Sequence, residues 1–304
     1  PMKKLAAAML IAALATGCVA CGSKENTSAN NASTDAAAEE TGDSAEASDS
    51  KSYSPTDIEY HSVAEIQKRG EIHFATEATF APYAFKDEAG NIVGLEPSMM
   101  QAIADEMGVK CVIDDMAFDS VLPSVQSGLD DMALAALSPT AERKEAFTFS
   151  ESYLAHGQLS LVRAEDADKF KDASAMVAGV TMGAQKGSYQ QTVAEHYYPD
   201  CTGRYMETIP NVIMDLKAGN IDIAIMDYDN ATAYASQNAD LATAFEVPML
   251  EGEEAANCAA AMLGNTDLTD YVNTLILKWL DDGTIENWYN EAVELQASLT
   301  DEAE

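Results

Sequence analysis

A short motif occurs twice in this chain of 304 residues and dictates the kind of fold that it can form. Gly128-Leu-Asp-Asp-Met-Ala-Leu134 matches Gly219-Asn-Ile-Asp-Ile-Ala-Ile225. Each copy follows a segment of helical periodicity, at 121–126 and at 212–217, and continues into an apolar run typical of a buried strand. Two such units predict two α/β lobes of similar build.

The rest of the folded part alternates between the strand and helix patterns. The predicted strands span 72–76, 111–116, 132–137 and 221–226, and the predicted helices span 97–107, 118–126 and 230–236. A hairpin-like turn is predicted at 87–91. This alternation predicts an α/β fold with a mostly parallel sheet, in which ligands bind beyond the carboxyl ends of the strands.

The N-terminus has the pattern of a targeting segment. Lys3 and Lys4 precede an apolar stretch at 5–15, which is too short to span a membrane as an ordinary helix. Small residues then lead to Cys18, as in a lipoprotein signal. We therefore predict a signal peptide at 1–17 and lipidation of Cys18, with Cys21 as the alternative.

Residues 18–55 are rich in Ser, Ala, Asn, Thr and acidic residues and contain almost no large apolar ones. Such a segment cannot bury enough surface to fold, so we predict a disordered acidic tether. Cys111, Cys201 and Cys258 follow at wide spacing, which carries no metal signature. We expect buried thiols, and a Cys201–Cys258 bridge stays open.

The composition excludes one class of partner. The chain has 17 basic and 51 acidic residues, for a net charge of −34. Binding to nucleic acid requires a basic surface for the phosphates, so that class is nearly excluded. A cationic ligand would be attracted, although solubility is the simpler explanation. The four histidines, at 61, 73, 156 and 196, show no ligand spacing, and no metal or cofactor is predicted.

An anion site is predicted where the strand at 132–137 ends. Ser138-Pro139 stops the strand, and Thr140 is an N-cap residue type that begins a helix with Arg143 in its first turn. A helix N-terminus favours anions, and a guanidinium donates two parallel hydrogen bonds to a carboxylate. The alternative is an arginine on an exposed helix face.

Other strand ends supply the opposite charge and a pocket. Asp227 follows the strand at 221–226 and can receive an ammonium group, or alternatively act as the N-cap of the next helix. Glu77 and Phe80 follow the first strand, and Phe118 follows the second. Two rings and a carboxylate suit a long side chain with a cationic end. The set predicts a site for a free α-amino acid.

These residues lie in segments that resemble the amino-acid-binding family of solute-binding proteins serving ABC importers, the bacterial extracellular solute-binding protein family 3. Two of the segments are Phe74-Ala-Thr-Glu-Ala-Thr-Phe-Ala-Pro-Tyr83 and Leu137-Ser-Pro-Thr-Ala-Glu-Arg143. The others are 94–96, 118–128, 144–150, 183–188, 215–227 and 282–285. The resemblance spans about residues 60–295.

The resemblance implies a type II periplasmic-binding-protein fold, in which two α/β lobes joined by a two-segment hinge close on the ligand. One lobe would comprise 56–157 and 255–304, and the other 158–254. Arg143 would bind the α-carboxylate with N–H groups at Ser138 and in the loop 187–189. The ligand-binding residues that it implies are Glu77, Phe80, Phe118, Ala136, Ser138, Arg143, Gln185, Ser188, Tyr189 and Asp227.

The resemblance also assigns the contacts with the rest of the ligand. Asp227 would take the α-ammonium together with the carbonyl of Ala136. Phe80 and Phe118 would enclose the side chain, with Glu77 at the specificity position. This combination is most similar to binders of arginine or of lysine, arginine and ornithine. Some relatives carry hydroxyl residues at Ala135 and Ala136, which weakens the polar contacts expected there. An uncharged polar ligand such as glutamine stays open, because family members that bind such ligands also carry an acid near Glu77.

The function implied is capture of a free L-amino acid outside the cytoplasm, by a monomer anchored to the membrane through lipid, and delivery to an ABC permease. Two alternatives stay open. A cyclohexadienyl-dehydratase-like enzyme on this fold would need a general acid, for which Glu77 is the candidate. A sensor module would normally require a following transmembrane or signalling segment, whereas a short, mostly acidic stretch follows Leu299.

Overall fold

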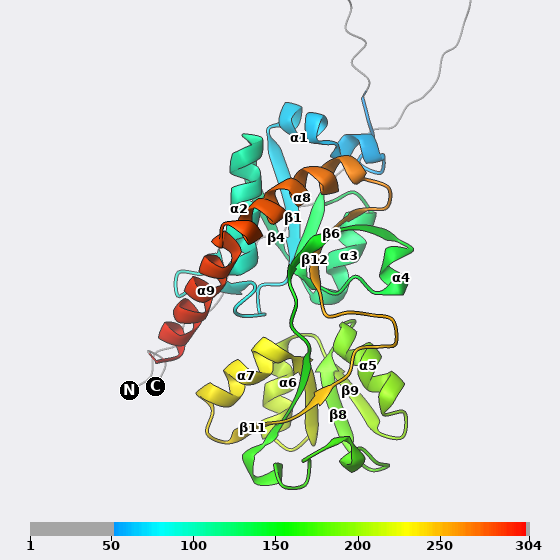
Figure 1. Cartoon of the computed structure of the whole chain (residues 1–304), viewed down its shortest axis with the longest axis vertical. Coiled ribbons are helices and arrows are strands. Elements are labelled where there is room, and N and C mark those ends of the chain that lie inside the picture. Colours follow the sequence, from blue (N-terminus) through cyan, green and yellow to red (C-terminus); the bar gives the residue numbers. More distant parts are fainter. Residues whose placement is uncertain (1–51, 302–304) are drawn as a thin grey trace, which may run out of the picture. The chain divides into compact units, whose positions relative to one another are not determined.

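The computed structural model describes residues 52–301. The predicted signal peptide, Cys18, Cys21 and most of the predicted tether lie outside the described residues. Within 52–301, no helix has both the length and the apolar character needed to cross a membrane. The described residues form two five-stranded sheets, each covered by helices, and a small hairpin of β2 (Phe85–Lys86) and β3 (Ile92–Val93) (Figure 1).

The first sheet, with its helices, is called the first lobe. Its strand order is β4-β1-β5-β12-β6. The strands are β1 (Glu71–Thr76), β4 (Lys110–Asp115), β5 (Met132–Leu137), β6 (Phe147–Leu154) and β12 (Asn257–Met262). One face packs on α2 and α8 through a core that includes Phe74, Leu134 and Ile103, and the other face packs on α3 through Val121.

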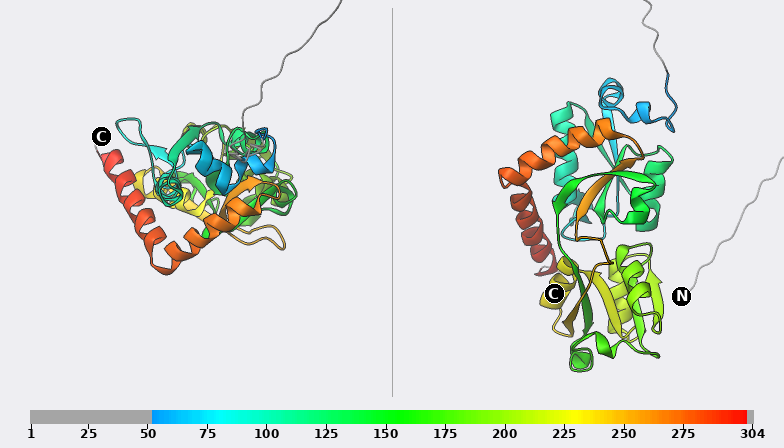
Figure 2. Two further views of the ribbon diagram at one scale, coloured as in Figure 1. Left: turned by 90° about the horizontal axis from the view of Figure 1, so that it is seen from above. Right: turned by 45° about the vertical axis from the view of Figure 1, so that its right-hand side comes forward.

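Helices of the first lobe come from both ends of the described chain. Their bounds are η1 (Ile58–His61), α1 (Val63–Arg69), α2 (Leu95–Met107), α3 (Phe118–Gln126), α4 (Ala141–Lys144), α8 (Thr266–Asp281) and α9 (Thr284–Asp301). Figure 2 shows α8 and α9 meeting at a corner beside the first sheet, where Gly283 has a φ of +78°.

The second sheet, with its helices, is called the second lobe, and its strand order is β11-β7-β10-β8-β9. Its strands are β7 (Gln158–Arg163), β8 (Thr181–Gln185), β9 (Thr202–Met206), β10 (Ile223–Asp227) and β11 (Leu241–Val247). Its helices are η2 (Ala164–Asp166), η3 (Ala173–Ala175), α5 (Tyr189–Tyr197), α6 (Ile209–Lys217) and α7 (Tyr228–Gln237). Apolar cores lie on both faces of this sheet.

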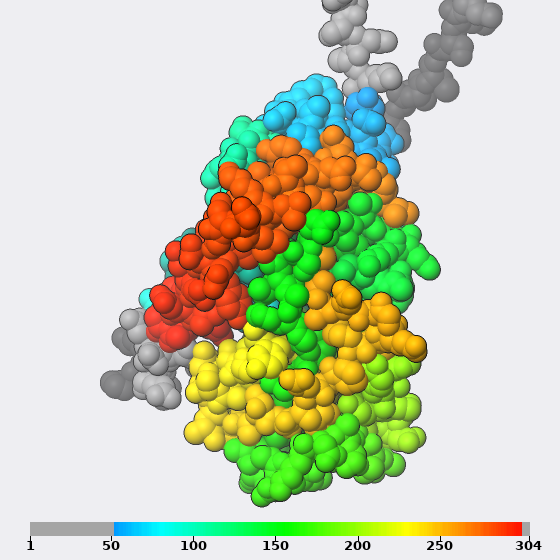
Figure 3. Space-filling view, in the orientation of Figure 1, coloured from blue at the N-terminus to red at the C-terminus, as the bar shows by residue number. Residues whose placement is uncertain are grey.

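Two segments join the lobes, one between β6 and β7 and one between β11 and β12 (Figure 1). Both are visible on the face shown in Figure 3, in green and in orange. The joined strands pair antiparallel, β12 with β6 and β11 with β7. The two-lobed α/β architecture is therefore confirmed, while the lobe boundaries themselves stay a prediction.

The expectation of a mostly parallel sheet is wrong. Each five-stranded sheet has two parallel pairings, β1 with β4 and β5, and β8 with β9 and β10. The other two pairings in each sheet are antiparallel. The reason is that the chain crosses to the second lobe and returns in opposite directions, and the crossing strands join the edge of each sheet.

The repeated motif forms the same local structure in both lobes. Gly128 and Gly219 lie two residues after the ends of α3 and α6, and both have a φ of +75°. In each case the two N–H groups that follow the helix donate to carbonyls of its last turn, as in a Schellman motif. The left-handed conformation favours glycine, so the motif fixes where each helix stops and the next strand begins.

The predicted elements agree with the structure apart from small shifts at their ends. The strand at 132–137 and the helix at 118–126 have the predicted bounds. Helix α2 begins two residues earlier than predicted, at Leu95, because Pro97 is tolerated in the first turn of a helix. Cys201 and Cys258 are free thiols, so the structure does not contain the bridge that had been left open.

Candidate functional site

The predicted site residues lie at the carboxyl ends of strands, where the two lobes contact each other. Glu77 follows β1, Ser138 follows β5, and Asp227 ends β10. Hydrogen bonds and ion pairs join the lobes around these positions. For example, Lys186 Nζ lies 2.8 Å from the carboxylate of Asp119 in the other lobe. The site is thus built between the lobes.

Arg143 is positioned by the short helix α4. The side chain of Thr140 caps this helix by accepting the N–H of Arg143 at 3.1 Å, as its residue type predicts. The guanidinium donates to the carbonyl of Ser138 at 3.0 Å and, across the lobes, to that of Gly187 at 3.2 Å. It also lies 6.0 Å from the ring centroid of Phe118.

Burial lowers the pKa of Arg143 to about 10, so its guanidinium stays charged at neutral pH. Its two donated bonds go to backbone carbonyls, which are neutral acceptors. A carboxylate at this position would offer charged and therefore stronger acceptors. A groove of about 440 Å³ opens beside Arg143 and is lined by residues of both lobes.

Asp227 lies buried at the start of α7. Its Oδ1 accepts the N–H of Asp229 at 3.0 Å, so it is the N-cap of this helix, and Tyr83 Oη lies 3.4 Å from the same oxygen. Burial and the neighbouring Asp229 raise the pKa of Asp227 to about 8. A cation beside this carboxylate would favour its ionised form. The capping role therefore does not exclude ligand binding.

Sequence reasoning missed the group around Asp229. Tyr83 donates its hydroxyl to Asp229 Oδ2 at 2.6 Å, and His156 Nδ1 lies 2.5 Å from the same oxygen. These residues come from both lobes and from the segment between β6 and β7. The only signal in the sequence was a second acid two positions after Asp227.

Glu77 is almost completely buried, with an exposed fraction of 3%. One of its oxygens accepts the hydroxyl of Thr79, and the other has no hydrogen-bond partner among residues 52–301. Burial raises the pKa of Glu77, although Thr79 and Gln185 lower it in part. Gln185 belongs to the second lobe and also donates to the carbonyl of Glu207 at 3.0 Å.

Phe80 is half-buried and packs against the apolar cores of both lobes. Its ring stacks on that of Tyr83, with centroids 5.3 Å apart and planes inclined by 21°. Phe118 is also half-buried and packs beside the core under α3. Both rings are therefore partly core residues.

Ala136 has a left-handed backbone, with a φ of +48°, which costs energy in a residue that has a Cβ. Its N–H donates to Glu96 Oε1 at 2.6 Å. Glu96 is fully buried, also accepts the hydroxyl of Tyr153, and has a pKa raised by burial to about 7. Glu96 thus holds the peptide of Ala136, a role that the Gly94-Leu-Glu segment did not reveal.

The loop at 187–189 has protein acceptors for two of its N–H groups. Gly187 donates to Gln191 Oε1 at 2.9 Å, and Ser188 donates to the carbonyl of Gln185 at 3.2 Å. Ser188 is the N-cap of α5. The side chain of Tyr189 lies in the core of the second lobe, where its hydroxyl accepts the N–H of Leu250 at 2.8 Å. The ligand-binding role of this loop stays a prediction.

The family model described as bacterial extracellular solute-binding proteins, family 3, matches residues 72–293. The chain belongs to this family. The resemblance stated from the sequence is thereby confirmed, and with it the type II periplasmic-binding-protein fold and an extracytoplasmic location.

Three of the similar proteins are named for arginine or were solved with it. The arginine-binding extracellular protein ArtP of Bacillus subtilis is 28% identical over 69% of this chain and 81% of its own length. The putative ABC transporter arginine-binding protein 2 of Escherichia coli is also 28% identical, over 72% of this chain and 89% of its own. An amino acid ABC transporter substrate-binding protein of Streptococcus pneumoniae, solved with L-arginine, has a similar structure. It is 34% identical with a TM-score of 0.72, and the match covers 76% of this chain and 97% of that chain.

Acidic groups outnumber basic groups around the site. Four buried carboxyl groups, those of Glu77, Glu96, Asp227 and Asp229, lie around it. Each of the first three has its pKa raised, mainly by burial. Of the basic groups, the imidazole of His156 contacts Asp229, whereas the guanidinium of Arg143 donates to the carbonyls of Ser138 and Gly187. Such a site can accept positive charge more readily than negative charge.

Proposed function

We propose that this chain captures a free cationic amino acid outside the cytoplasm and delivers it to the permease of an ABC importer. Arginine, lysine and ornithine are the candidate ligands. The observation that carries the proposal is the excess of buried carboxyl groups over basic groups between the lobes. The names of the arginine-binding relatives support the same ligand class.

The roles of the residues follow from their charges and positions. Arg143 binds the α-carboxylate, which replaces a neutral carbonyl as its acceptor. Asp227 and the carbonyl of Ala136 bind the α-ammonium. Glu96 accepts the N–H of Ala136 and so holds this residue in its left-handed conformation. Glu77, with its unpartnered oxygen, binds the cationic end of the side chain. Phe80 and Phe118 contact its methylenes.

An uncharged ligand such as glutamine fits this site less well. Its side-chain amide could donate a hydrogen bond to Glu77. The negative charge of the buried Glu77 carboxylate would then have no positive group to compensate it. Burying an unpaired charge is costly, whereas a guanidinium or ammonium group compensates it. The ligand therefore carries two positive groups.

A dehydratase-like enzyme is the second candidate, favoured by two observations. Glu77 is buried with a raised pKa, as a general acid requires. An ancestral amino-acid-binding protein described as a precursor of cyclohexadienyl dehydratase is 26% identical, with a TM-score of 0.70. Prephenate carries two carboxylates, however, and the acidic site would repel one of them. Incubation with prephenate or arogenate tests this candidate directly, because turnover would support it.

We further propose that the chain acts as a monomer held at the membrane by a lipid on Cys18 or Cys21. The support is the sequence pattern around these cysteines. Mass spectrometry of the mature N-terminus distinguishes the two sites. Replacing the modified cysteine with serine should release the protein from the membrane fraction.

A thermal-shift screen against the twenty amino acids, ornithine and citrulline tests the main proposal. A ligand that binds only the folded chain raises the melting temperature by mass action. At a hundredfold excess over Kd the gain is about 2.7 kcal/mol. We expect arginine, lysine or ornithine to give the largest shift. A shift by neutral amino acids without one from these three would reject the cationic ligand.

A further inference from the structure

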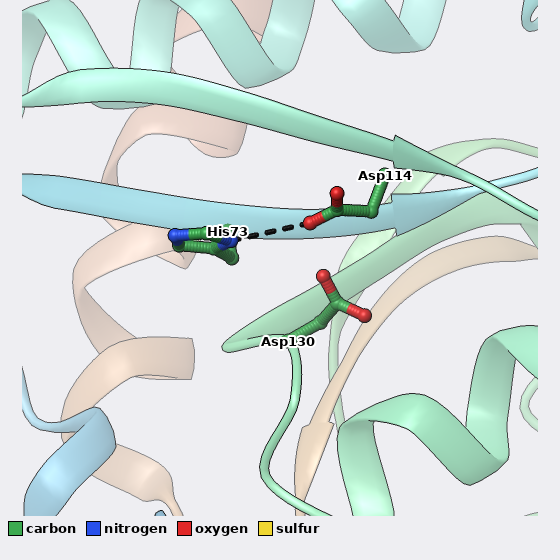
Figure 4. A group of neighbouring side chains, drawn as sticks. All are labelled: His73, Asp114 and Asp130. Atoms are coloured by element: carbon green, nitrogen blue, oxygen red, sulfur yellow. Dashed lines mark hydrogen bonds and ion pairs between the residues drawn. The ribbon is translucent and has the colours of Figure 1, made fainter. Parts of the chain in front are cut away.

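A second cluster of ionisable groups lies in the first lobe, apart from the residues of the amino-acid site. His73 lies on β1, Asp114 lies on β4, and Asp130 lies just before β5 (Figure 4). One ligand atom from each lies within 4.8 Å of the others. Figure 4 shows the three side chains turned toward a common space.

Asp130 is the unusual member of this cluster. It is only 1% exposed, yet neither of its carboxylate oxygens has a hydrogen-bond partner among residues 52–301. The nearby hydroxyl of Ser124 donates instead to the carbonyl of Val121 at 2.9 Å. A charged carboxylate without a partner is costly to bury, so this position favours either a proton or a metal ion beside it.

The repeated motif provides an internal comparison for this cluster. Asp130 precedes Asp131 in the first lobe, and Ile221 precedes Asp222 in the second. Ile221 is fully buried, and its methyl group lies over Gly183 of the neighbouring strand, where an added Cβ would come within 2.4 Å of it. The second lobe fills this position with an apolar side chain, while the first lobe buries a carboxylate there.

The other two positions follow the same comparison. Asp131 accepts the N–H of His73, and Asp222 accepts that of Thr181, so His73 corresponds to Thr181. Two residues further along these strands, Ala75 pairs with Asp114 and Gly183 pairs with Arg204. The three equivalents in the second lobe are thus Thr181, Arg204 and Ile221. None of these three second-lobe positions carries a histidine or a carboxylate.

We propose that His73, Asp114 and Asp130 bind a divalent transition-metal ion of the Zn²⁺ class. Imidazole nitrogen with two carboxylates is a common ligand set for such ions. His73 Nδ1 lies 3.2 Å from Asp114 Oδ2. Two ligand atoms at about 2.0–2.1 Å from one tetrahedral ion lie about 3.3 Å apart, which matches this separation.

The surroundings also suit a metal ion. His73 Nε2, the nitrogen on the other side of the ring, lies 3.2 Å from Glu71 Oε1. A metal-binding histidine commonly donates its second N–H to a carboxylate in this way. The side chains of His73 and Asp114 are 30% and 42% exposed, which leaves room for water as a fourth ligand. The ion would tie together β1, β4 and the start of β5.

Titration of the untagged full chain with Zn²⁺, after removal of metal with EDTA, tests the proposal. We expect one equivalent to bind with a Kd in the micromolar range or below, and the melting temperature to rise by several degrees and fall again with EDTA. Co²⁺ should give a visible d–d absorption without a thiolate charge-transfer band, which excludes binding by the free cysteines. No Zn²⁺ uptake, or uptake of Ca²⁺ in preference to Zn²⁺, would overturn the proposal.

Two variants assign the site. Asp130→Ile copies the residue of the second lobe, and Asp130→Asn keeps the shape while removing the charge. Both variants should bind Zn²⁺ at least a hundredfold more weakly than the wild type. Their amino-acid binding should be unchanged, which would show that they are folded. Controls are His196→Gln and Asp168→Asn, on the surface of the second lobe, which should bind Zn²⁺ as before. Wild-type Zn²⁺ affinity in Asp130→Asn would mean that Asp130 is not a ligand and would overturn the proposed site.

Discussion

The two copies of the repeated motif place the same residue type in the same structural role, but the surroundings differ. Asp131 and Asp222 both accept the N–H of the neighbouring parallel strand at 2.8 Å. Both also face an arginine, at 2.6 Å for Arg69 and 3.7 Å for Arg163. The side chain of Asp131 is 2% exposed and that of Asp222 is 28% exposed.

The copies diverge beyond the strand that follows. In the first lobe β5 continues into Ala136, Ser138 and Arg143, and in the second lobe β10 ends at the buried Asp227. The repeated aspartates hold the sheets together, whereas the segments at the opposite ends of the same strands carry the candidate ligand groups. In the proposed function, one supersecondary unit, used twice, supplies one charge of the zwitterion site from each lobe.

The largest effect on stability is expected from Asp131→Asn, compared with Asp222→Asn. Asparagine keeps an oxygen for the strand N–H but removes the charge facing the arginine. Asp131 is buried with Arg69 and also lies 2.6 Å from His61 Nδ1, and breaking a buried pair costs about 3–5 kcal/mol. The less buried and more widely separated pair of Asp222 is worth about 1 kcal/mol or less. Urea unfolding of the two variants measures both, and equal losses would contradict the comparison.

The largest effect on binding is expected from Arg143→Ala. Truncating one partner of a buried charge pair costs about 2–5 kcal/mol, or roughly thirty- to several-thousand-fold in affinity. Calorimetric titration should show this loss for every α-amino acid that binds the wild type. Arg204→Ala is the matched control, because Arg204 pairs with Asp215 at the surface. Unchanged affinity in Arg143→Ala would remove it from the site.

Asp227→Asn should separate binding from stability. The variant loses the ammonium partner but keeps an N-cap residue, so ligand binding falls while the helix stays capped. Because the folded-state pKa of Asp227 is raised to about 8, its contribution to stability is complete below pH 4 and is lost as the pH rises through about 8.

The melting temperature without ligand, measured from pH 5 to pH 9, tests this sign. Relative to that of the wild type, the melting temperature of Asp227→Asn should rise with pH. At pH 9 the difference should be about 2–4 °C for each kcal/mol of unfolding free energy that the wild type loses by ionising Asp227. A variant that is less stable than the wild type at every pH would show that Asp227 is chiefly structural.

A smaller effect is expected in the number of protons released when the ligand binds. The pKa values of Asp227 and Glu96 are raised to about 8 and about 7, and the positive groups of the ligand would lower them. Binding at pH 7 should therefore release protons, and affinity should increase from pH 6 to pH 8. Calorimetry in phosphate and in Tris measures the release as a difference in binding enthalpy. Equal enthalpies in both buffers would contradict it.

The sequence by itself determined the repeated unit, the α/β class and most of the elements, because helix ends, glycine positions and apolar periodicity are local signals. It also predicted Arg143 and Asp227 as candidate site residues, since a charged residue at a strand end is visible in the chain. The family resemblance added the ligand class, and the comparisons with known proteins support it.

Only the tertiary structure decided the rest. It brings Tyr83 and His156 to Asp229, and Glu96 to Ala136, over separations of 40–146 residues. It makes half of the strand pairings antiparallel, and it joins His73, with no ligand spacing in the sequence, to Asp114 and Asp130. These contacts and pairings depend on which strands become neighbours. Strand pairing is set by burial between residues far apart in the sequence, which a local sequence pattern does not contain.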